Sequence, residues 1–191
     1  MENITIQRSA LVSAYRAGNE EQKQMLEHLY GKEVLTTNWR DITSYEKACE
    51  VLGIQPSEFK EVGDRPQYMR MANAMQQLLV ICEAINGESG WYDSYGYGHF
   101  PVILLYTKKE MQEYDEAECK RKGIHQILAA GYAHSTKCAG ARCVVKYYHS
   151  EDSLTYYGFP LCLNSEEKAA FVGEQFFELC CTCYGLTPKM D

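Results

Sequence analysis

Hydrophobic positions in the first half of the chain recur every three or four residues, the spacing that places side chains on one face of a helix. This pattern predicts helix over residues 8–30, and Gly18 divides the segment into two pieces. A second helix begins with a capping box at residues 43–46 and ends at Gly53. A third helix covers residues 65–86. Its predicted core stripe consists of Tyr68, Met71, Met75, Leu78, Cys82 and Ile85.

Beyond residue 98 the pattern changes to short apolar runs rich in β-branched and aromatic residues, which indicates strands. Gly-rich or charged connections separate the runs, and no long helical pattern lies between them. Consecutive strands of this kind predict an antiparallel meander. Residues 108–120 either form a short helix or leave the sheet at its edge. The predicted strands cover residues 100–106, 124–130, 143–148 and 154–163.

The last helical pattern begins with a capping box at residues 164–167 and stops before Gly185 and Pro188. Its apolar face needs a partner, and the preceding sheet is the nearest surface. We therefore predict a single α+β domain over residues 1–191. Its N-terminal helices (1–86) precede a roughly four-stranded antiparallel meander that a C-terminal amphipathic helix closes (99–186). The apolar positions of that helix are Ala169, Val172, Phe176, Leu179, Cys180 and Cys183.

The composition supports a folded domain and limits the classes of partner that we expect it to bind. Apolar residues make up 46% of the chain and aromatic residues 12%, more than a disordered chain carries. The net charge of −7 argues against nucleic acid as a partner, because phosphate contacts need clustered Lys and Arg. The basic run 120–122 follows the acidic stretch 113–116, so the local charges cancel. No apolar run approaches the roughly 18 residues that span a bilayer, and we predict no membrane association.

The nine cysteines favour a reducing compartment. Their number is odd, the chain begins directly in polar sequence without a leader, and Cys180 and Cys181 are adjacent within a helical pattern. Thiols in such positions act as small core residues rather than as disulfide partners. The sequence therefore predicts a cytoplasmic protein.

An aromatic and Gly-rich segment, residues 91–100, is the strongest candidate for a recognition surface. Rigid rings provide contact area at little entropic cost, and glycines let a loop fold closely around a partner. The simpler interpretation is an ordered loop whose rings complete the core, and both stay open. The candidate contact residues are Trp91, Tyr92, Tyr95, Tyr97, His99, Tyr147 and Tyr156, with Tyr148 and Tyr157 beside them.

Residues that could carry metal or nucleophilic chemistry form only a weak pattern. His134, Cys138 and Cys143 are separated by three and four residues, without the paired C-x-x-C of zinc knuckles and ribbons. His134 and Cys138 could meet as base and nucleophile only if this Gly- and Ser-flanked stretch were helical. The chain contains no G-x-S-x-G, H-E-x-x-H or Walker sequence. We therefore predict no cofactor, and the sequence favours a protein that is not an enzyme.

Residues 44–60 could form a helix-turn-helix, since a helix, a Gly turn and a Ser- or Pro-led segment follow one another. The second helix would carry Glu58, Glu61 and Asp64 against only Lys60. This charge suits a phosphate-lined groove poorly, so a structural helical hairpin is favoured over a nucleic-acid-binding module.

Three stretches of the chain resemble known sequences. Residues 41–54, and further along residues 159–167 and 173–176, are similar to uncharacterised proteins of gut Bacteroidetes and of their phages and integrated elements. The resemblance leaves the middle of the chain uncovered and implies no reaction. It implies a phage or mobile-element setting, in which small proteins often bind other proteins or form parts of a virion.

These observations predict a non-enzymatic binding or structural protein of phage or mobile-element type, with the aromatic segment as its contact surface. Its partner would be another protein or a second copy of the chain. The alternatives are a nucleic-acid-associated module acting through residues 44–60 and a Cys/His metal-binding enzyme.

Overall fold

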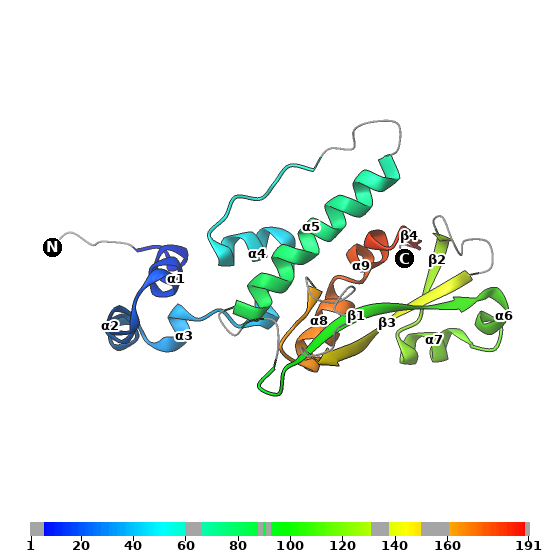
Figure 1. The fold of residues 1–191 in the computed structure, drawn as a ribbon. Helices are drawn as coiled ribbons and strands as arrows, with labels where there is room; N and C mark the ends of the chain where they lie inside the picture. Colours follow the sequence, from blue (N-terminus) through cyan, green and yellow to red (C-terminus); the bar gives the residue numbers. More distant parts are fainter. Residues whose placement is uncertain are drawn as a thin grey trace.

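The computed structural model describes residues 6–59, 66–87, 90, 93–130, 138–149 and 161–189. The described chain is a mixed helix and sheet structure, as the sequence predicts. Short N-terminal helices lie at one end, a long helix crosses the middle, and the sheet with its two covering helices lies at the other end (Figure 1).

The N-terminal segment forms two helices that separate at Gly18, which confirms the predicted division. The second helix starts with a capping box, because the side chain of Asn19 accepts the N–H of Gln22 and the Gln22 side chain accepts that of Asn19. A short third helix and a 3₁₀ turn follow, neither of which the periodicity indicated. These elements are α1 (Arg8–Ala17), α2 (Glu20–Tyr30), α3 (Lys32–Leu35) and η1 (Trp39–Asp41).

Helix α4 (Tyr45–Leu52) ends where the sequence predicts. Gly53 follows it with a φ of 69°, a left-handed conformation that costs glycine little. Its cap is Ser44, whose hydroxyl accepts the N–H of Lys47, and not the predicted Thr43. The buried residues of this helix, Tyr45, Ala48, Cys49 and Val51, belong to the main core.

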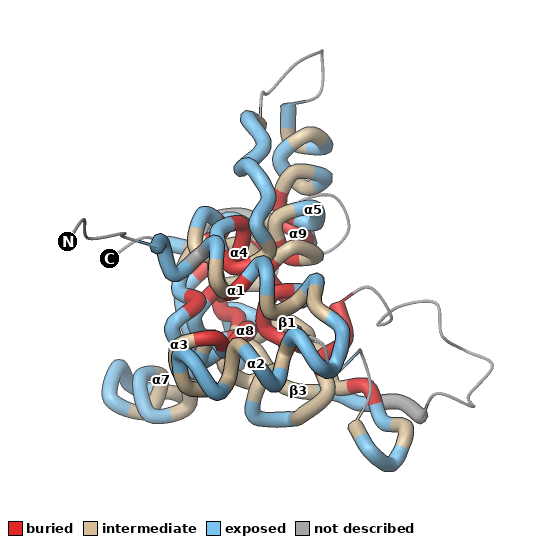
Figure 2. The backbone as a smooth tube through the Cα atoms, turned by 90° about the vertical axis from the view of Figure 1, so that its left-hand side faces the viewer, coloured by how far each residue is buried: buried red, intermediate tan, exposed pale blue. Residues whose placement is uncertain are grey.

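Helix α5 (Pro66–Asn86) is buried over only half of its length. Leu78, Cys82 and Ile85 of the predicted stripe lie in the core, whereas Tyr68 and Met75 remain 40% and 38% exposed. The first turns extend beyond α9 (Figure 2), and residues 66–73 are all exposed or half-buried. The stripe was therefore a correct prediction for the second half of the helix and wrong for the first half.

Three of the predicted strands are present and form an antiparallel sheet. Its order is not that of a meander, because β3 lies between β1 and β2 and pairs with both. Helices α6 (Lys108–Met111) and α7 (Glu116–Lys122) separate β1 from β2 in the chain, which precludes a tight hairpin between them. The strands are β1 (Tyr97–Thr107), β2 (His125–Ala130) and β3 (Cys138–His149).

The fourth predicted strand is only partly described, since residues 154–160 lie outside the described part of the chain. Its end, Leu163, forms a single antiparallel bridge with His99. A short strand that the sequence did not predict, β4 (Leu186–Pro188), pairs with the other side of β2. The last described element is therefore a strand and not a helix.

The predicted C-terminal helix is divided into α8 (Glu166–Gln175) and α9 (Phe177–Cys183). Phe176 between them leaves the helical conformation, with φ −114° and ψ 31°. Helix α8 packs on β1 and β3, and α9 packs on α5. Buried side chains of both helices belong to the two core clusters.

All nine cysteines are free thiols, and six of them are buried. This agrees with their predicted use as small core residues. None of the helices in the described ranges combines the length and the apolar character that a membrane crossing requires. The buried cysteines are Cys49, Cys82, Cys162, Cys180, Cys181 and Cys183.

Candidate functional site

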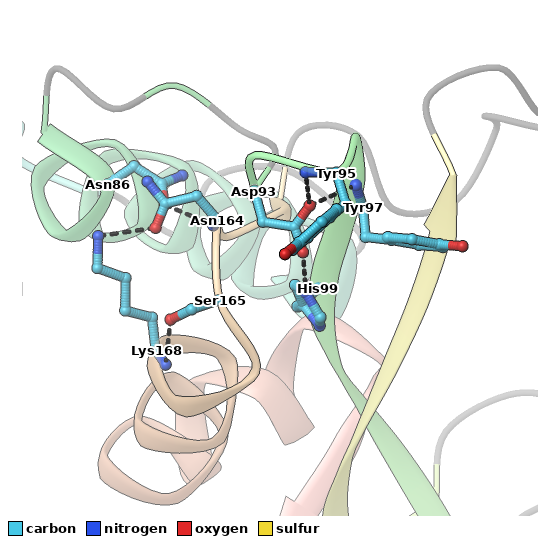
Figure 3. A network of polar contacts seen from close by, with 8 residues as sticks. All are labelled: Asn86, Asp93, Tyr95, Tyr97, His99, Asn164, Ser165 and Lys168. Atoms are coloured by element: carbon cyan, nitrogen blue, oxygen red, sulfur yellow. Dashed lines mark hydrogen bonds and ion pairs between the residues drawn. The ribbon is translucent and has the colours of Figure 1, made fainter.

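Asp93 builds the turn that leads into β1. Its Oδ1 accepts the backbone N–H groups of Tyr95 and Tyr97 at 2.8 and 2.9 Å. The backbone N–H of Asp93 donates to the carbonyl of Tyr97, and Gly96 completes the turn with a φ of 83°. Figure 3 shows the carboxylate enclosed by this turn. The N–H of Tyr97, followed by smaller contributions from His99 and Tyr95, holds the pKa of Asp93 below its ordinary value.

The other carboxylate oxygen of Asp93 faces His99, with 3.2 Å between Oδ2 and Nε2. Both side chains are largely buried, with 15% of His99 and 23% of Asp93 exposed. Nδ1 of His99 is buried and has no hydrogen-bond partner among the described residues. The backbone of His99 is fixed as well, because it exchanges two hydrogen bonds with Leu163, at 2.9 and 2.7 Å. The ring therefore has a fixed position at the start of the sheet.

Pairing of β1 with β3 brings three of the predicted contact residues together. His99 lies opposite Tyr147, and the ring centroids of these two residues are 6.2 Å apart. Tyr97 and Tyr147 meet edge to face, with centroids 5.6 Å apart. Tyr95 is 78% exposed, Tyr147 68% and Tyr97 37%. We call Tyr95, Tyr97 and Tyr147 the tyrosine patch.

A second group of polar residues lies next to this turn in Figure 3 and joins the end of α5 to the start of α8. Asn86 is buried, with only 5% of its surface exposed. Its amide donates to the carbonyl of Cys162 at 2.7 Å, and its Oδ1 accepts the N–H of Asn164 at 3.1 Å. Asn164 in turn accepts from Nζ of Lys168 and donates to the carbonyl of Gly90. This group fixes the segments on both sides of the Asp93 turn.

Sequence reasoning missed Asp93, Asn86 and Lys168 as site residues. Asp93 had a recognisable signal in the sequence. It precedes an aromatic residue by two positions and a Gly by three, a pattern typical of turns that an Asp side chain closes. Asn86 had a weaker one, a lone amide at the end of an apolar helical pattern. Lys168 had no such signal in the sequence. In the structure, burial lowers the pKa of its ammonium group.

The structure describes four of the seven predicted contact residues: Tyr97, His99 and Tyr147 lie together, and Tyr95 lies on the Asp93 turn that precedes them. The other three, together with Tyr157 and the side chain of Tyr148, lie outside the described residues. Those three are Trp91, Tyr92 and Tyr156.

The predicted metal candidates are described only in part, since His134 lies outside the described residues. Cys138 and Cys143 are half-buried on β3 and pack against the smaller core cluster. Burial raises the pKa of the Cys143 thiol to about 11, which keeps it protonated at neutral pH. Within the described part of the chain, His, Cys, Asp and Glu side chains do not gather in groups of three that could hold a metal ion.

The predicted second helix of a helix-turn-helix is not present in residues 54–59, which have no regular secondary structure. The reason lies in their contacts with α4. The N–H of Ser57 donates to the hydroxyl of Tyr45, and Phe59 packs on the same ring with centroids 5.5 Å apart. These contacts hold the segment extended along α4, and Pro56 disfavours helix at the residue before it.

The exposed rings of the tyrosine patch offer contact area, whereas the ring nitrogens of His99 are turned toward the protein. Nε2 of His99 faces a carboxylate and Nδ1 is buried, so neither nitrogen is open to a substrate. The chain matches no protein-family model, and the comparisons with curated proteins and with solved structures found no match.

Proposed function

We propose that this chain is a non-enzymatic binding or structural protein that recognises a protein partner through the tyrosine patch. The observation that carries the proposal is the exposure of Tyr95 and Tyr147, 78% and 68%, on a turn and a strand with fixed positions. Exposed tyrosines on a rigid support lose little entropy when they bind, and they are enriched in protein interfaces.

Preorganisation supports the same proposal. Asp93 closes the turn that bears Tyr95 with two hydrogen bonds, and the β1–β3 ladder sets Tyr97 beside Tyr147. A surface that is ordered before binding avoids the cost of ordering it in the complex. The net charge of −7 favours a protein over a nucleic acid as the partner. A phage or mobile-element setting and a reducing cytoplasm fit a binding protein with nine free thiols.

The experiment compares partner capture by three forms of the full chain. We expect the wild type to capture a defined protein, or a second copy of itself, and the Tyr95→Ala/Tyr147→Ala double variant to lose it. Tyr184→Ala is the matched control, because Tyr184 is 49% exposed and lies at the end of α9. Circular dichroism checks that all three forms are folded.

The interaction with the captured protein is then measured with purified components. Removal of two interface tyrosines should weaken it by about 2 kcal/mol or more, which is about thirtyfold in Kd. Equal binding by the wild type and the double variant would show that the tyrosine patch is not the contact surface. If the captured protein is the chain itself, sedimentation will show self-association that the double variant lacks.

A further inference from the structure

A cavity of about 570 Å³ lies away from the tyrosine patch, in the region where α4, α5, the α8–α9 junction and β2 meet. In Figure 1, α5 passes between α4 and α9 in this region. A cavity of this size is within the range that small-molecule sites occupy. Its charged lining residues are Glu46, Glu174, Glu178, His125 and Lys189.

The charge of the lining is negative. Three carboxylates and one ammonium group, that of Lys189, line the cavity, which gives a formal charge of −2 with His125 neutral. Nζ of Lys189 donates to Oε1 of Gln126 on β2, at 3.3 Å. None of the three carboxylates forms an ion pair with another described residue. The carboxylates are therefore available to a positively charged ligand.

Helix ends modify this field without reversing it. The N-termini of α4 and α9 bring partial positive charge to the wall, and Glu46 and Glu178 in their first turns offset that charge. The last turn of α8, with Glu174 and Gln175, brings partial negative charge. The sum remains favourable to a cation.

The cavity also has an apolar wall. Ile81, Phe176 and Phe177 line it, and the ring of His125 lies over that of Phe177 with centroids 4.3 Å apart. Phe176 and Phe177 are 8% and 7% exposed, so they present a small apolar surface that suits the hydrocarbon part of a ligand. A simple inorganic ion would make no use of it.

The carboxylates do not converge on one point. Among the described residues, including Glu46, Glu174, Glu178 and His125, there is no group of three that could hold a metal ion. Separated carboxylates beside an apolar wall fit charges that are themselves separated by hydrocarbon. We infer that this cavity binds an organic cation, with ammonium or guanidinium groups on an apolar stem, as in a polyamine or in the Lys and Arg side chains of a peptide.

The test titrates the full-length protein with two probes of this chemistry, spermidine and the peptide acetyl-Lys-Phe-Lys-amide. Acetyl-Glu-Phe-Glu-amide and inorganic phosphate serve as anionic controls. Calorimetry at low ionic strength measures affinity, and NMR locates the probe by the ring signals of His125 and Phe177. Saturable binding of spermidine alone identifies a polyamine as the source of the cation, and tighter binding of the peptide identifies a protein segment.

The variants are Glu174→Gln and Glu178→Gln, with Glu83→Gln as the matched control, because Glu83 is an exposed glutamate outside the cavity. We expect each cavity variant to weaken binding about two- to fivefold, in the range of exposed ion pairs, and the control to leave it unchanged. Binding should also weaken as salt is added.

Several results would overturn the inference. One is the absence of saturable binding by both cationic probes. Another is binding of phosphate or of the anionic peptide as tight as that of the cations. Equal losses in Glu83→Gln and in the cavity variants would show a general charge effect, and shifts confined to the tyrosine patch would place the site elsewhere.

Discussion

Gly173 of α8 lies against Cys143 of β3 with no space for another atom between them. A Cβ atom at residue 173 would be 2.1 Å from Sγ of Cys143, 3.0 Å from its Cβ and 3.3 Å from Cβ of Pro101. The helix therefore lies as close to the β1–β3 pair as its backbone allows. This contact fixes the distance between the helical layer and the strands that carry Tyr97 and Tyr147.

We expect Gly173→Ala to lower the free energy of unfolding. Alanine in a helix gains about 1 kcal/mol over glycine, but overpacking at so short a distance costs about 1–3 kcal/mol and moves the helix. Removing the sulfur in a Gly173→Ala/Cys143→Ala double variant should recover part of the loss, so the two changes should not be additive. Denaturant titration measures these two variants and the Cys143→Ala single variant. A single Gly173→Ala variant at least as stable as the wild type would contradict this packing.

The buried thiols should react slowly in the folded protein. Burial raises the pKa of Cys82 and Cys180, and it raises that of Cys181 to about 12. Since the thiolate is the reactive form, a disulfide reagent at pH 8 should label Cys119 and Cys138 first. Mass spectrometry of digested samples identifies the labelled positions, and denatured protein, in which all cysteines are accessible, is the control. Rapid labelling of Cys82 in the folded protein would contradict the burial described above.

Local signals account for most of what the sequence predicts correctly. Gly18 and Gly53 follow the last residues of α1 and α4, as predicted, and Gly53 does so in the left-handed conformation that favours glycine. These features depend on a few neighbouring residues. They can therefore be predicted without the fold to within one residue, since the caps are Ser44 and Ser165 and not the predicted Thr43 and Asn164.

Features that depend on distant residues could not be predicted in this way. Periodicity marks α5 as amphipathic but does not say how far α9 extends along it, so the exposure of Tyr68 and Met75 was missed. The pairing of β1 with β3 joins segments about forty residues apart. The same holds for the site, because composition suggests Tyr97 and Tyr147 separately and only the strand register brings them together.

Asn86→Ala should destabilise the protein more than Asn164→Ala. Asn86 is buried, and its loss would leave the carbonyl of Cys162 and the N–H of Asn164 without their side-chain partner. An orphaned buried polar group costs about 1–3 kcal/mol. The side-chain bonds of Asn164 are at or near the surface, where water can replace them. Urea titration compares the two variants, and equal stability losses would show that the buried amide has no special role.

The Asp93 carboxylate should contribute to stability in a way that depends on pH. Its pKa is lower in the folded protein than its ordinary value of 3.8, chiefly because the N–H of Tyr97 stabilises the charged form. The contribution is therefore complete above the unfolded-state pKa and is lost as pH falls through the folded-state pKa. Carbon-13 NMR of the carboxyl group should show a titration below pH 3.8.

Two variants separate the causes of this shift. His99→Gln should raise the pKa of Asp93 only in part, because the two backbone N–H groups remain. Asp93→Asn keeps an oxygen that can accept both N–H groups and should retain the turn, whereas Asp93→Ala should lose it and increase the mobility of Tyr95. If the pKa of Asp93 returned to 3.8 in His99→Gln, the imidazole and not the turn would be the main cause of the shift.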